Sequence, residues 1–561
     1  MSRRPPADPQ VSGPAGPRYV LAVDLGGTRF RAALVDEAGG IAHACAIDSP
    51  AGTDLHPGWD EIDADEWWRG LQVLSDTLAR QAGADFDAIA ALAICGVTRT
   101  QVFVDARGAP VRPAITWRDT RTAGQVAQWL AAMPTDHPEA AQINAFHPWA
   151  RVAWLLRAEP RHAARVRVVL EPKDYLNFRL TGRAASDTVS MARLAAAARA
   201  HGPQGAEHLQ DLPGAQGGQG VGGGQGPQAA QATQATHGRQ SPAFDLLTAV
   251  GADPGWVPPL LDPLAIVGPV QPGLPGSLAR LAGRGVVACS NDTWAAVAGL
   301  GALRPGYAYN ISGTTEVFGA VGAEPVQAEG LMTVNWGNGN HQIGGPGQNG
   351  ADTIAWLLPL LGKVARFGGL QAGGLSAVSD AMNALLDAPR DPQPALFLPY
   401  LQGERVPYWD PRLRGAFIGL NRRHGPGDLA WAVLEGVAFL NRTVLQRAEA
   451  ALGAPVAEIR FGGGAASNPH WCQVKADICE RPVVVGQADQ PGVIGAAAAA
   501  WTALGHYDSF AQAQATLARP AHRYDPDASR RNAYHRLYAQ FRAAEAALTP
   551  VSHALASLRL P

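Results

Sequence analysis

Residues 19–35 read YVLAVDLGGTRFRAALV. This stretch has the pattern of an apolar strand, a glycine turn and a second apolar strand, and a third strand begins at Ile41 after a short polar turn. Residues 65–82 then show apolar positions at helical spacing, and residues 88–97 form another apolar strand. Strands that alternate with helices in this way favour an α/β fold with a central mixed sheet covered by helices on both faces.

The opening pattern recurs in the second half of the chain. A short strand at 285–288 leads into SNDTWAAVAGLG, residues 290–301, and residues 307–319 read as a further hairpin with a glycine turn at 312–315. A second copy of strand, glycine turn and strand is what two related lobes that hold one nucleotide would produce.

The composition limits the classes of function. A chain of 561 residues should form at least two large domains, and its 47% hydrophobic and 17% charged residues are typical of globular proteins. We expect no membrane association, because no uninterrupted apolar stretch reaches the roughly 20 residues of a membrane helix. The formal net charge of -2 disfavours nucleic acid as a partner. The five cysteines are scattered and form no CxxC pair, which favours reduced thiols.

Two segments are expected to lack a fold of their own. Residues 1–18 are rich in Pro and Gly and have no apolar core of the kind a signal peptide needs, so we predict a disordered tail and a cytoplasmic location. Residues 201–240 are rich in Gly, Gln and Ala and are interpreted as a disordered surface insertion, with a functional tether as the alternative.

The chain contains three lysines, and none follows glycine in a GK[ST] motif, which excludes a P-loop. A bound triphosphate would therefore need backbone N–H groups, arginine and a metal ion. The DLGGT turn offers such groups: Gly26 and Gly27 allow a positive φ, Thr28 adds a hydroxyl, and Arg31 could reach phosphate oxygens. Asp24 could hold Mg²⁺ through water. An ordinary tight hairpin is the structural alternative.

Two later glycine segments offer similar groups. The turn at 312–315, with Gly313 and Thr314, supplies a hydroxyl and backbone donors from the second lobe. FGGGAASN, residues 461–468, lies between a strand and a helix, so its backbone could pack against a nucleobase or ribose, and Asn468 could bond the adenosine. A plain strand-to-helix turn would have the same pattern.

The order of these motifs, from about residue 20 to residue 505, resembles that of the FGGY carbohydrate kinases. The strongest match is RGAFIGLNRRHGPGDLAWAVLEG, residues 414–436, which fits the second signature of the family. FHPWARVAWLLRAEP, residues 146–160, fits the first signature less well, because Arg151 stands where the family usually has lysine and Ala158 replaces a polar residue.

The resemblance implies two actin-like (ribonuclease H-like) ATPase domains, each a mixed sheet flanked by helices, with a catalytic cleft between them. It also implies ATP and Mg²⁺ as cofactors. The implied roles are metal binding for Asp24, phosphate contacts for Thr28, Arg31, Gly313 and Thr314, adenosine-side contacts for Gly463, Gly464 and Asn468, and the catalytic base for Asp292.

Asp292 also has a rationale of its own. It stands between a strand end and a helix start, where a carboxylate can cap the helix and face a ligand. As a base, it would orient the attacking hydroxyl group and accept its proton late, because phosphoryl transfer needs little activation of the nucleophile. A pure helix cap is the alternative.

The residues expected to face the acceptor depart from those of the better-known kinases of this family. Gln101 and Val102 fall where glycerol kinases have Arg-Glu and xylulose kinases have Met-His, and Phe146 stands where glycerol kinases use tyrosine. The loss of the charged pair argues against glycerol. Gln101, Trp117 and Asp119 could serve a neutral ketose such as xylulose or another pentulose, although Trp117 and Asp119 could equally hold the WRDTR loop. Glycerol and gluconate stay as alternative acceptors.

The expected organisation is a tail at 1–18, an N-terminal sugar- and phosphate-binding domain at 19–302, a C-terminal nucleotide-binding domain at 303–530 and a helical tail at 531–561. A small sugar or polyol is the expected partner, and a homodimer is compatible with the sequence. Two rivals remain, a catalytically silent sugar sensor and an actin-like or chaperone-like ATPase. Intact Asp24, Thr28 and Asp292 argue against the sensor, and the 414–436 signature argues against the ATPase.

Overall fold

A computed structural model gives the structure of the chain. It describes residues 19–53, 56–132, 137–199, 245–313, 315–362 and 374–559. The predicted tail, the predicted insertion and Thr314 lie outside these residues. The chain forms two compact units: unit 1 comprises Met1–Ser49, Leu71–Gly96 and Asp262–Pro561, and unit 2 comprises Pro50–Gly70 and Val97–Leu261.

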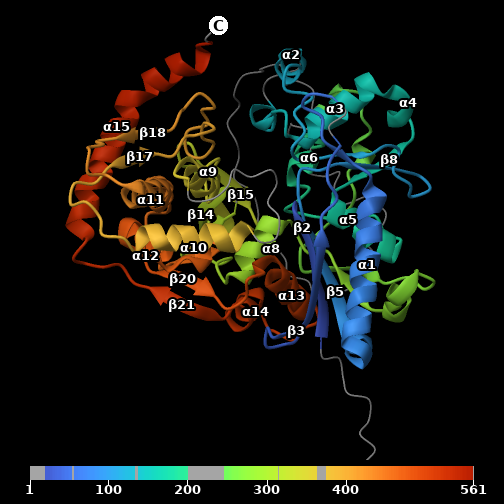
Figure 1. Cartoon of the computed structure of the whole chain (residues 1–561). Coiled ribbons are helices and arrows are strands. Elements are labelled where there is room, and N and C mark those ends of the chain that lie inside the picture. Colours follow the sequence, from blue (N-terminus) through green and yellow to red (C-terminus); the bar gives the residue numbers. More distant parts are fainter. Residues whose placement is uncertain are drawn as a thin grey trace, which may run out of the picture. The chain divides into compact units, whose positions relative to one another are not determined.

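Unit 1 contains a six-stranded mixed sheet in the order β11-β12-β5-β1-β2-β3. Figure 1 labels β2, β3 and β5 of this sheet. Its strands are β1 (Tyr19–Leu25), β2 (Arg29–Val35), β3 (Ile41–Asp48), β5 (Ile89–Gly96), β11 (Ile266–Pro269) and β12 (Gly285–Val287). β1 pairs antiparallel with β2 and parallel with β5, and β5 pairs parallel with β12. The strands predicted from residues 19–35 and 88–97 are therefore confirmed.

Helices cover this sheet. In the part of α1 (Ala64–Ala82) that belongs to unit 1, Leu71, Leu74 and Leu78 are buried. α13 (Pro491–Ala503) packs on β1 and β5, and α8 (Asp292–Gly299) packs on α13. The last two helices approach closely, because a Cβ atom at Gly495 would lie 1.8 Å from the carbonyl oxygen of Ala295. Glycine is therefore needed where these helices meet.

Unit 1 also contains a seven-stranded mixed sheet in the order β15-β16-β14-β13-β19-β20-β21. Its strands are β13 (Tyr307–Ser312), β14 (Glu316–Gly322), β15 (Met332–Asn335), β16 (His341–Pro346), β19 (Ile459–Gly462), β20 (Val483–Gly486) and β21 (Pro520–Tyr524). β13 pairs antiparallel with β14 and parallel with β19, as β1 does with β2 and β5. The predicted recurrence of the opening hairpin is confirmed, and so is a fold of two mixed sheets flanked by helices.

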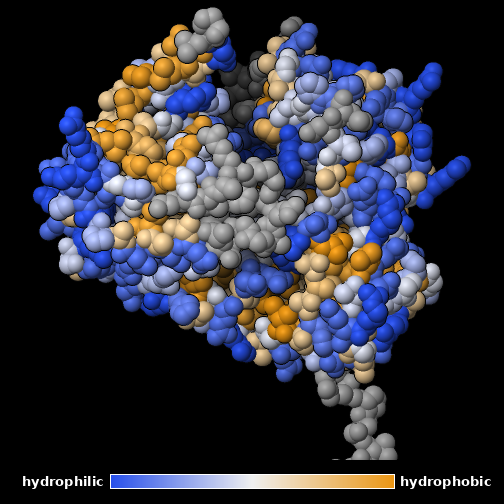
Figure 2. Space-filling model, in the orientation of Figure 1, coloured by the Kyte–Doolittle hydropathy of each residue, from blue (hydrophilic) through white to orange (hydrophobic). Residues whose placement is uncertain are grey.

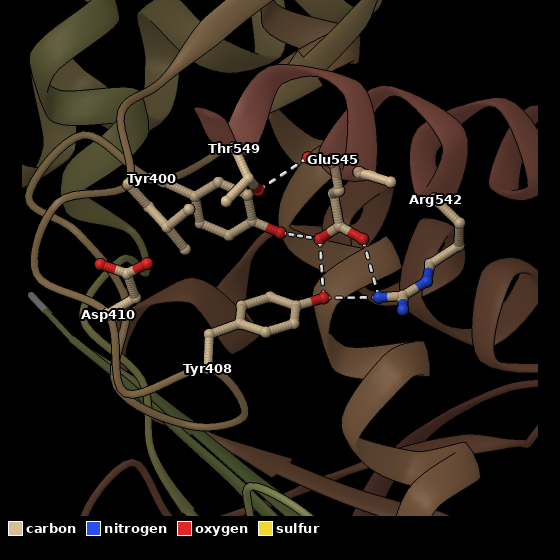
Figure 3. Close-up of a pocket in the computed structure, with 8 residues that line it drawn as sticks. Tyr400, Tyr408, Asp410, Arg542, Glu545 and Thr549 are labelled. Carbon is tan, nitrogen blue, oxygen red and sulfur yellow. Dashed lines mark hydrogen bonds and ion pairs between the residues drawn. The ribbon is translucent and has the colours of Figure 1, made fainter. Parts of the chain in front are cut away.

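The helices around the second sheet include two of 27 residues. They are α9 (Asp352–Leu360), α10 (Gly374–Leu386), α11 (Pro426–Leu452), α12 (Pro469–Cys479) and α15 (Arg531–Ser557), with the small hairpin of β17 (Leu396–Leu398) and β18 (Ala416–Ile418). α14 (Phe510–Leu517) packs instead on α13 and α8. α15 is fastened by Glu545, which accepts hydrogen bonds from Tyr400, Tyr408 and Arg542 beside a cavity of about 260 Å³ (Figure 3). Since each of these polar groups is paired, the cluster serves to anchor the helix.

Apolar side chains gather on the exposed face of α15 (Figure 2), where Val551 and Leu555 are about half exposed. Leu558, directly after the helix, is 62% exposed. The same helix carries charged residues such as Arg536 and Arg542. Among the residues that the structure describes, no helix combines the length and the apolar character that crossing a membrane requires.

Unit 2 is built from short elements. Its strands pair as β4 (Glu61–Ile62) with β7 (Ala114–Ile115), β6 (Val102–Asp105) with β8 (Val166–Leu170), and β9 (Ser186–Asp187) with β10 (Leu260–Leu261). Its helices are α2 (Val126–Ala131), α3 (Pro148–Ala158), α4 (Pro160–Ala163), α5 (Pro172–Thr181), α6 (Ala192–Ala197) and α7 (Leu246–Ala249). Trp149 and Trp154 of α3 lie in the core of this unit.

Candidate functional site

Asp24, Asn291 and Asp292 lie at the carboxyl edge of the six-stranded sheet. Asp24 near the end of β1 is the register partner of Cys95 on β5, and Asn291 forms a parallel bridge with Gly96. Asp292 follows directly as the first residue of α8. The carboxyl ends of parallel strands are where α/β sheets commonly bind ligands. The fold therefore brings the predicted metal ligand and the predicted base to the same sheet edge.

Asp24 is held in a nearly buried environment, with its side chain 13% exposed. Its carboxylate lies 3.7 Å from Arg31 Nη1 and accepts a hydrogen bond of 3.7 Å from Cys95 Sγ. A Cβ atom at Gly492 would lie 2.7 Å from Asp24 Oδ2, so the start of α13 stands against the carboxylate. Burial raises the pKa of Asp24, and Arg31 and Cys95 only partly oppose this.

Asp292 does not cap its helix. The N-cap of α8 is Asn291, whose Oδ1 accepts a 2.9 Å hydrogen bond from the backbone N–H of Trp294. The alternative of a pure helix cap at Asp292 is therefore wrong, because Asn291 already fills that position. Asp292 Oδ1 accepts a 2.7 Å bond from the N–H of Thr293. Burial, and next the negative charge of Asp24, raise the pKa of Asp292 to about 7.

The carboxylate of Asp24, whose charge acts on Asp292, is chemically suited to Mg²⁺. Within the described part of the chain no group of three or more His, Cys, Asp or Glu side chains could hold a metal ion. Mg²⁺ suits this arrangement, because it keeps several waters and commonly takes one or two carboxylates together with phosphate oxygens. The mutual repulsion of Asp24 and Asp292 would fall on binding a cation.

The raised pKa of Asp292 predicts a pH-dependent stability. In the unfolded chain this carboxyl group is ionised above about pH 4, whereas in the ligand-free folded protein it keeps its proton until about pH 7. Stability therefore falls as the pH rises towards and through 7, and the neutral variant Asp292→Asn escapes this loss. We expect the unfolding free energy of Asp292→Asn, relative to the wild type, to grow by about 2 kcal/mol between pH 5 and pH 8.

Denaturant unfolding of both proteins at the two pH values measures this difference. A difference that stays constant or becomes smaller at pH 8 would contradict the assignment of a raised pKa to Asp292.

The first glycine turn is held by hydrogen bonds within the unit. The N–H of Gly26 donates to the carbonyl of Arg29 at 3.1 Å, and Ser49 bonds the carbonyls of Gly26 and Thr28. The prediction that Gly26 takes a positive φ is wrong. Glycine is needed there because a Cβ atom would lie 2.9 Å from the carbonyl oxygen of Arg29. Thr28 at the tip is exposed.

The second turn and the third glycine segment pack on each other. β13 and β19 run parallel with Ile311 opposite Gly462, and Gly463 has a φ of 89°. A Cβ atom at Gly463 would lie 2.3 Å from the carbonyl oxygen of Ser312. The N–H of Gly313 donates to the carbonyl of Thr315 at 3.0 Å, so this amide is not available to a phosphate in this conformation.

The remaining residues of the third segment differ in accessibility. A Cβ atom at Gly464 would meet open space. Asn468 is 2% exposed and is the N-cap of α12, with its Oδ1 accepting from the N–H of Trp471 and its Nδ2 donating to Asn383. The structure therefore places Gly464 where a ligand could approach, whereas the amide of Asn468 is engaged in the protein.

A buried ion pair lies next to the second turn and was not predicted. Lys475 Nζ lies 2.6 Å from Glu316 Oε1, and both side chains are at most 4% exposed. Asn310 Nδ2 donates to the same carboxylate oxygen at 2.8 Å. The pair ties α12 to the strand that follows the turn. Lys475 could have been singled out from the sequence, because it is one of three lysines in the chain.

The predicted acceptor residues lie in unit 2 and divide into two groups. Trp117 and Phe146 are 41% and 37% exposed. Gln101 and Val102 are fully buried, and Asp119 is 1% exposed. Val102 belongs to β6, so its side chain is part of the core. Trp117 and Phe146 are therefore the accessible members of the predicted set.

Asp119 is engaged in an internal network. Its oxygens accept from the N–H of Asp60 at 2.8 Å and from the guanidinium of Arg121 at 2.7 to 2.9 Å. Arg121 also contacts Glu61 and stacks on the ring of Trp59 at 3.8 Å. With both oxygens occupied, Asp119 has the contacts expected if it holds the WRDTR loop.

A further residue of this region, Arg151, stood out in the sequence only as a departure from the family signature. It is fully buried and donates to the carbonyl oxygens of Arg99, Thr116 and Phe146 and to Gln101 Oε1. Two of its partners, Gln101 and Phe146, are predicted acceptor residues, and a third, Thr116, directly precedes Trp117.

Comparisons with known proteins agree with this architecture. Residues 19–196 match the model for the N-terminal domain of the FGGY family of carbohydrate kinases, and residues 308–504 match the model for its C-terminal domain. The chain is 28% identical over 514 residues to a glycerol kinase of Bordetella parapertussis, covering 88% of this chain and 90% of the relative. It is 26% identical over 544 residues to a xylulose kinase of Escherichia coli, covering 93% and 98%.

Among solved structures, the xylulose kinase of Rhodospirillum rubrum superimposes with a TM-score of 0.76 at 23% identity, covering 96% of this chain and all of that chain. The fold is therefore that of a two-domain FGGY kinase, in agreement with the actin-like class expected from the sequence.

Proposed function

The chain belongs to the FGGY family of carbohydrate kinases, so it is an ATP-dependent phosphotransferase with a small sugar or polyol as substrate, and we propose that its acceptor is a neutral pentulose and its metal Mg²⁺. Asp24 is the metal-associated carboxylate and Asp292 is the base in this proposal. The observation that carries it is the pair of buried carboxylates, both with a raised pKa, at one edge of the six-stranded sheet.

The roles follow from the chemistry of phosphoryl transfer, in which positioning and neutralisation of charge dominate. Asp292 orients the acceptor hydroxyl group and takes its proton, and burial raises the pKa of this carboxyl group and so favours its role as a base. Thr28 and Arg31 contact phosphate oxygens, and Gly463 and Gly464 lie on the adenosine side. Asp24 would hold Mg²⁺ through water, and the bound ion would supply positive charge beside the phosphates.

The acceptor class rests on the accessible surface of unit 2. Trp117 and Phe146 offer aromatic faces, on which the C–H groups of a sugar can pack. Gln101 and Val102 carry no charge, unlike the Arg-Glu pair of the glycerol kinases that the sequence resembles. A neutral ketose fits these features better than glycerol.

Gluconate is the second candidate, because one cation lies at the aromatic surface. The guanidinium carbon of Arg118 is 5.0 Å from the centre of the Trp117 ring, and Arg118 is exposed. A sugar carboxylate beside Trp117 could pair with this arginine.

A panel of acceptors tests the proposal. ADP release is measured with Mg²⁺ATP and a series of pentuloses, with glycerol and with gluconate, each with and without EDTA. We expect kcat/KM to be at least about tenfold higher for one pentulose than for glycerol or gluconate, and EDTA to abolish turnover. Preference for gluconate would support the second candidate. ADP release without any sugar, or no release with any, would overturn the assignment of a sugar kinase and favour the ATPase or the sensor.

A further inference from the structure

We infer that Arg151 is the positioning residue of the acceptor site, because its buried guanidinium joins the three separate segments that carry Gln101, Trp117 and Phe146 and presets the surface on which the sugar binds. This inference rests on the proposed function, since it concerns the same acceptor site in unit 2.

The contacts of Arg151 reach each segment. Nη1 donates to the carbonyl oxygen of Arg99 at 2.5 Å, to Gln101 Oε1 at 2.9 Å and to the carbonyl oxygen of Phe146 at 3.3 Å. Nη2 donates to the carbonyl oxygen of Thr116 at 2.8 Å, one residue before Trp117. Loss of the guanidinium would therefore release both exposed aromatic residues and Gln101 together.

Both backbone polar groups of Arg99, its N–H and its carbonyl, are hydrogen-bonded to buried side chains. Its φ is 57°, in the left-handed region that residues other than glycine, asparagine and aspartate rarely adopt. Its N–H donates to Glu171 Oε1 at 2.9 Å, and its carbonyl accepts from Arg151. Both partners are at most 1% exposed. Such strain persists only when neighbouring groups impose it, and it gathers at ligand-binding sites.

The electrostatics indicate that this arrangement serves specificity more than stability. The hydrogen bonds of Arg151 go to neutral oxygens, and burial lowers its pKa to about 10 despite the charges of Asp119 and Glu171. Arg151 Nε and Gln101 Nε2 are buried without a hydrogen-bond partner among the described residues. A buried charge and two unsatisfied donors are costly, which favours a functional reason for keeping them.

Lysine, the usual residue of the family signature here, cannot replace these contacts. Its ammonium group is a compact point charge with three donors, whereas the planar guanidinium has five donors spread over three nitrogen atoms. Arg151→Lys keeps the charge but cannot reach all three segments at once. The variant therefore separates positioning from charge.

The kinetic test uses the best acceptor from the panel. We expect Arg151→Lys to raise the KM for the acceptor at least about tenfold while the KM for ATP changes less than about twofold, because the nucleotide residues belong to unit 1. Arg442→Lys is the matched control. Arg442 is also a buried arginine that donates to a carbonyl oxygen, that of Ile478 at 2.9 Å, but it lies in unit 1 and should leave both KM values unchanged.

Glu171 provides a conservative pair of variants. Glu171→Gln keeps an oxygen for the N–H of Arg99 and should leave the KM for the acceptor within about threefold, whereas Glu171→Ala removes that oxygen and should raise it as Arg151→Lys does. Unchanged acceptor KM in Arg151→Lys, or an equal rise in both KM values, would overturn the inference.

A measurement without substrate keeps the inference testable even if the panel finds no acceptor. Amide hydrogen exchange of the ligand-free Arg151→Lys protein should accelerate at least about fivefold in peptides covering residues 97–102, 114–119 and 144–148 together, and not in peptides of unit 1. Exchange that rises in one of these segments alone, or throughout unit 2, would contradict a residue that joins all three. Failure of the panel would count against the proposed function and leave this readout intact.

Discussion

Replacement of Asp292 by asparagine should lower kcat for sugar phosphorylation by about 10³-fold, while the Kd for ATP stays within about threefold. The side chain keeps its shape and its oxygen for the N–H of Thr293, so the helix start is preserved and the loss reports on the missing base. General bases typically contribute about 10² to 10⁴ in rate. Quenched-flow or coupled ADP assays give kcat, and calorimetry with a nonhydrolysable ATP analogue gives the Kd.

A helix-start aspartate in unit 2 provides the control. Asp245 is the N-cap of α7 and accepts a 2.6 Å bond from the N–H of Thr248, a role that asparagine also fills. Asp245→Asn should therefore leave kcat unchanged. If Asp292→Asn retained more than about a tenth of the wild-type kcat, Asp292 would not be the base.

The second large effect concerns the contact between α8 and α13. Gly495→Ala should lower the unfolding free energy by about 3 kcal/mol or more, because its Cβ atom would lie 1.8 Å from the carbonyl oxygen of Ala295, on the helix that begins with Asp292. The backbones must move apart, and such a shift also displaces the base. We expect a lower melting temperature and a reduced kcat in the same variant.

Two further glycine variants test whether close helix packing causes this effect. Gly299→Ala should behave similarly, because its Cβ atom would lie 1.8 Å from the carbonyl oxygen of Pro491 on α13. Gly124→Ala is the matched control, since a Cβ atom there meets no atom within 4 Å. Differential scanning calorimetry and denaturant unfolding measure the changes. A stability of Gly495→Ala within about 0.5 kcal/mol of the control would show that the helices adapt, against the close packing described here.

Local patterns made the strands and turns predictable. The apolar runs of residues 19–35 and 307–319 specify strands through side chains that alternate between two covered faces, and the glycine turns follow from backbone sterics. The segments that carry Asp24 and Asp292 were predicted for the same reason, because Asp24 lies near the end of β1 and Asp292 begins the helix that comes after β12. The reason that glycine is needed at position 26 was not predictable, since the approach of the Arg29 carbonyl depends on the conformation of the whole turn.

The sequence by itself therefore determined the α/β class, the repeated hairpin and the positions of the two carboxylates at strand ends. Tertiary structure alone decided that Asn291 and not Asp292 caps α8, that Asp119 is enclosed by Asp60 and Arg121, and that Trp117 stays exposed. It also placed the guanidinium of Arg151 among segments that are up to 52 residues away in the chain. The physical reason is that burial and hydrogen-bond partners arise from contacts between distant segments, which no local spacing of residue types records.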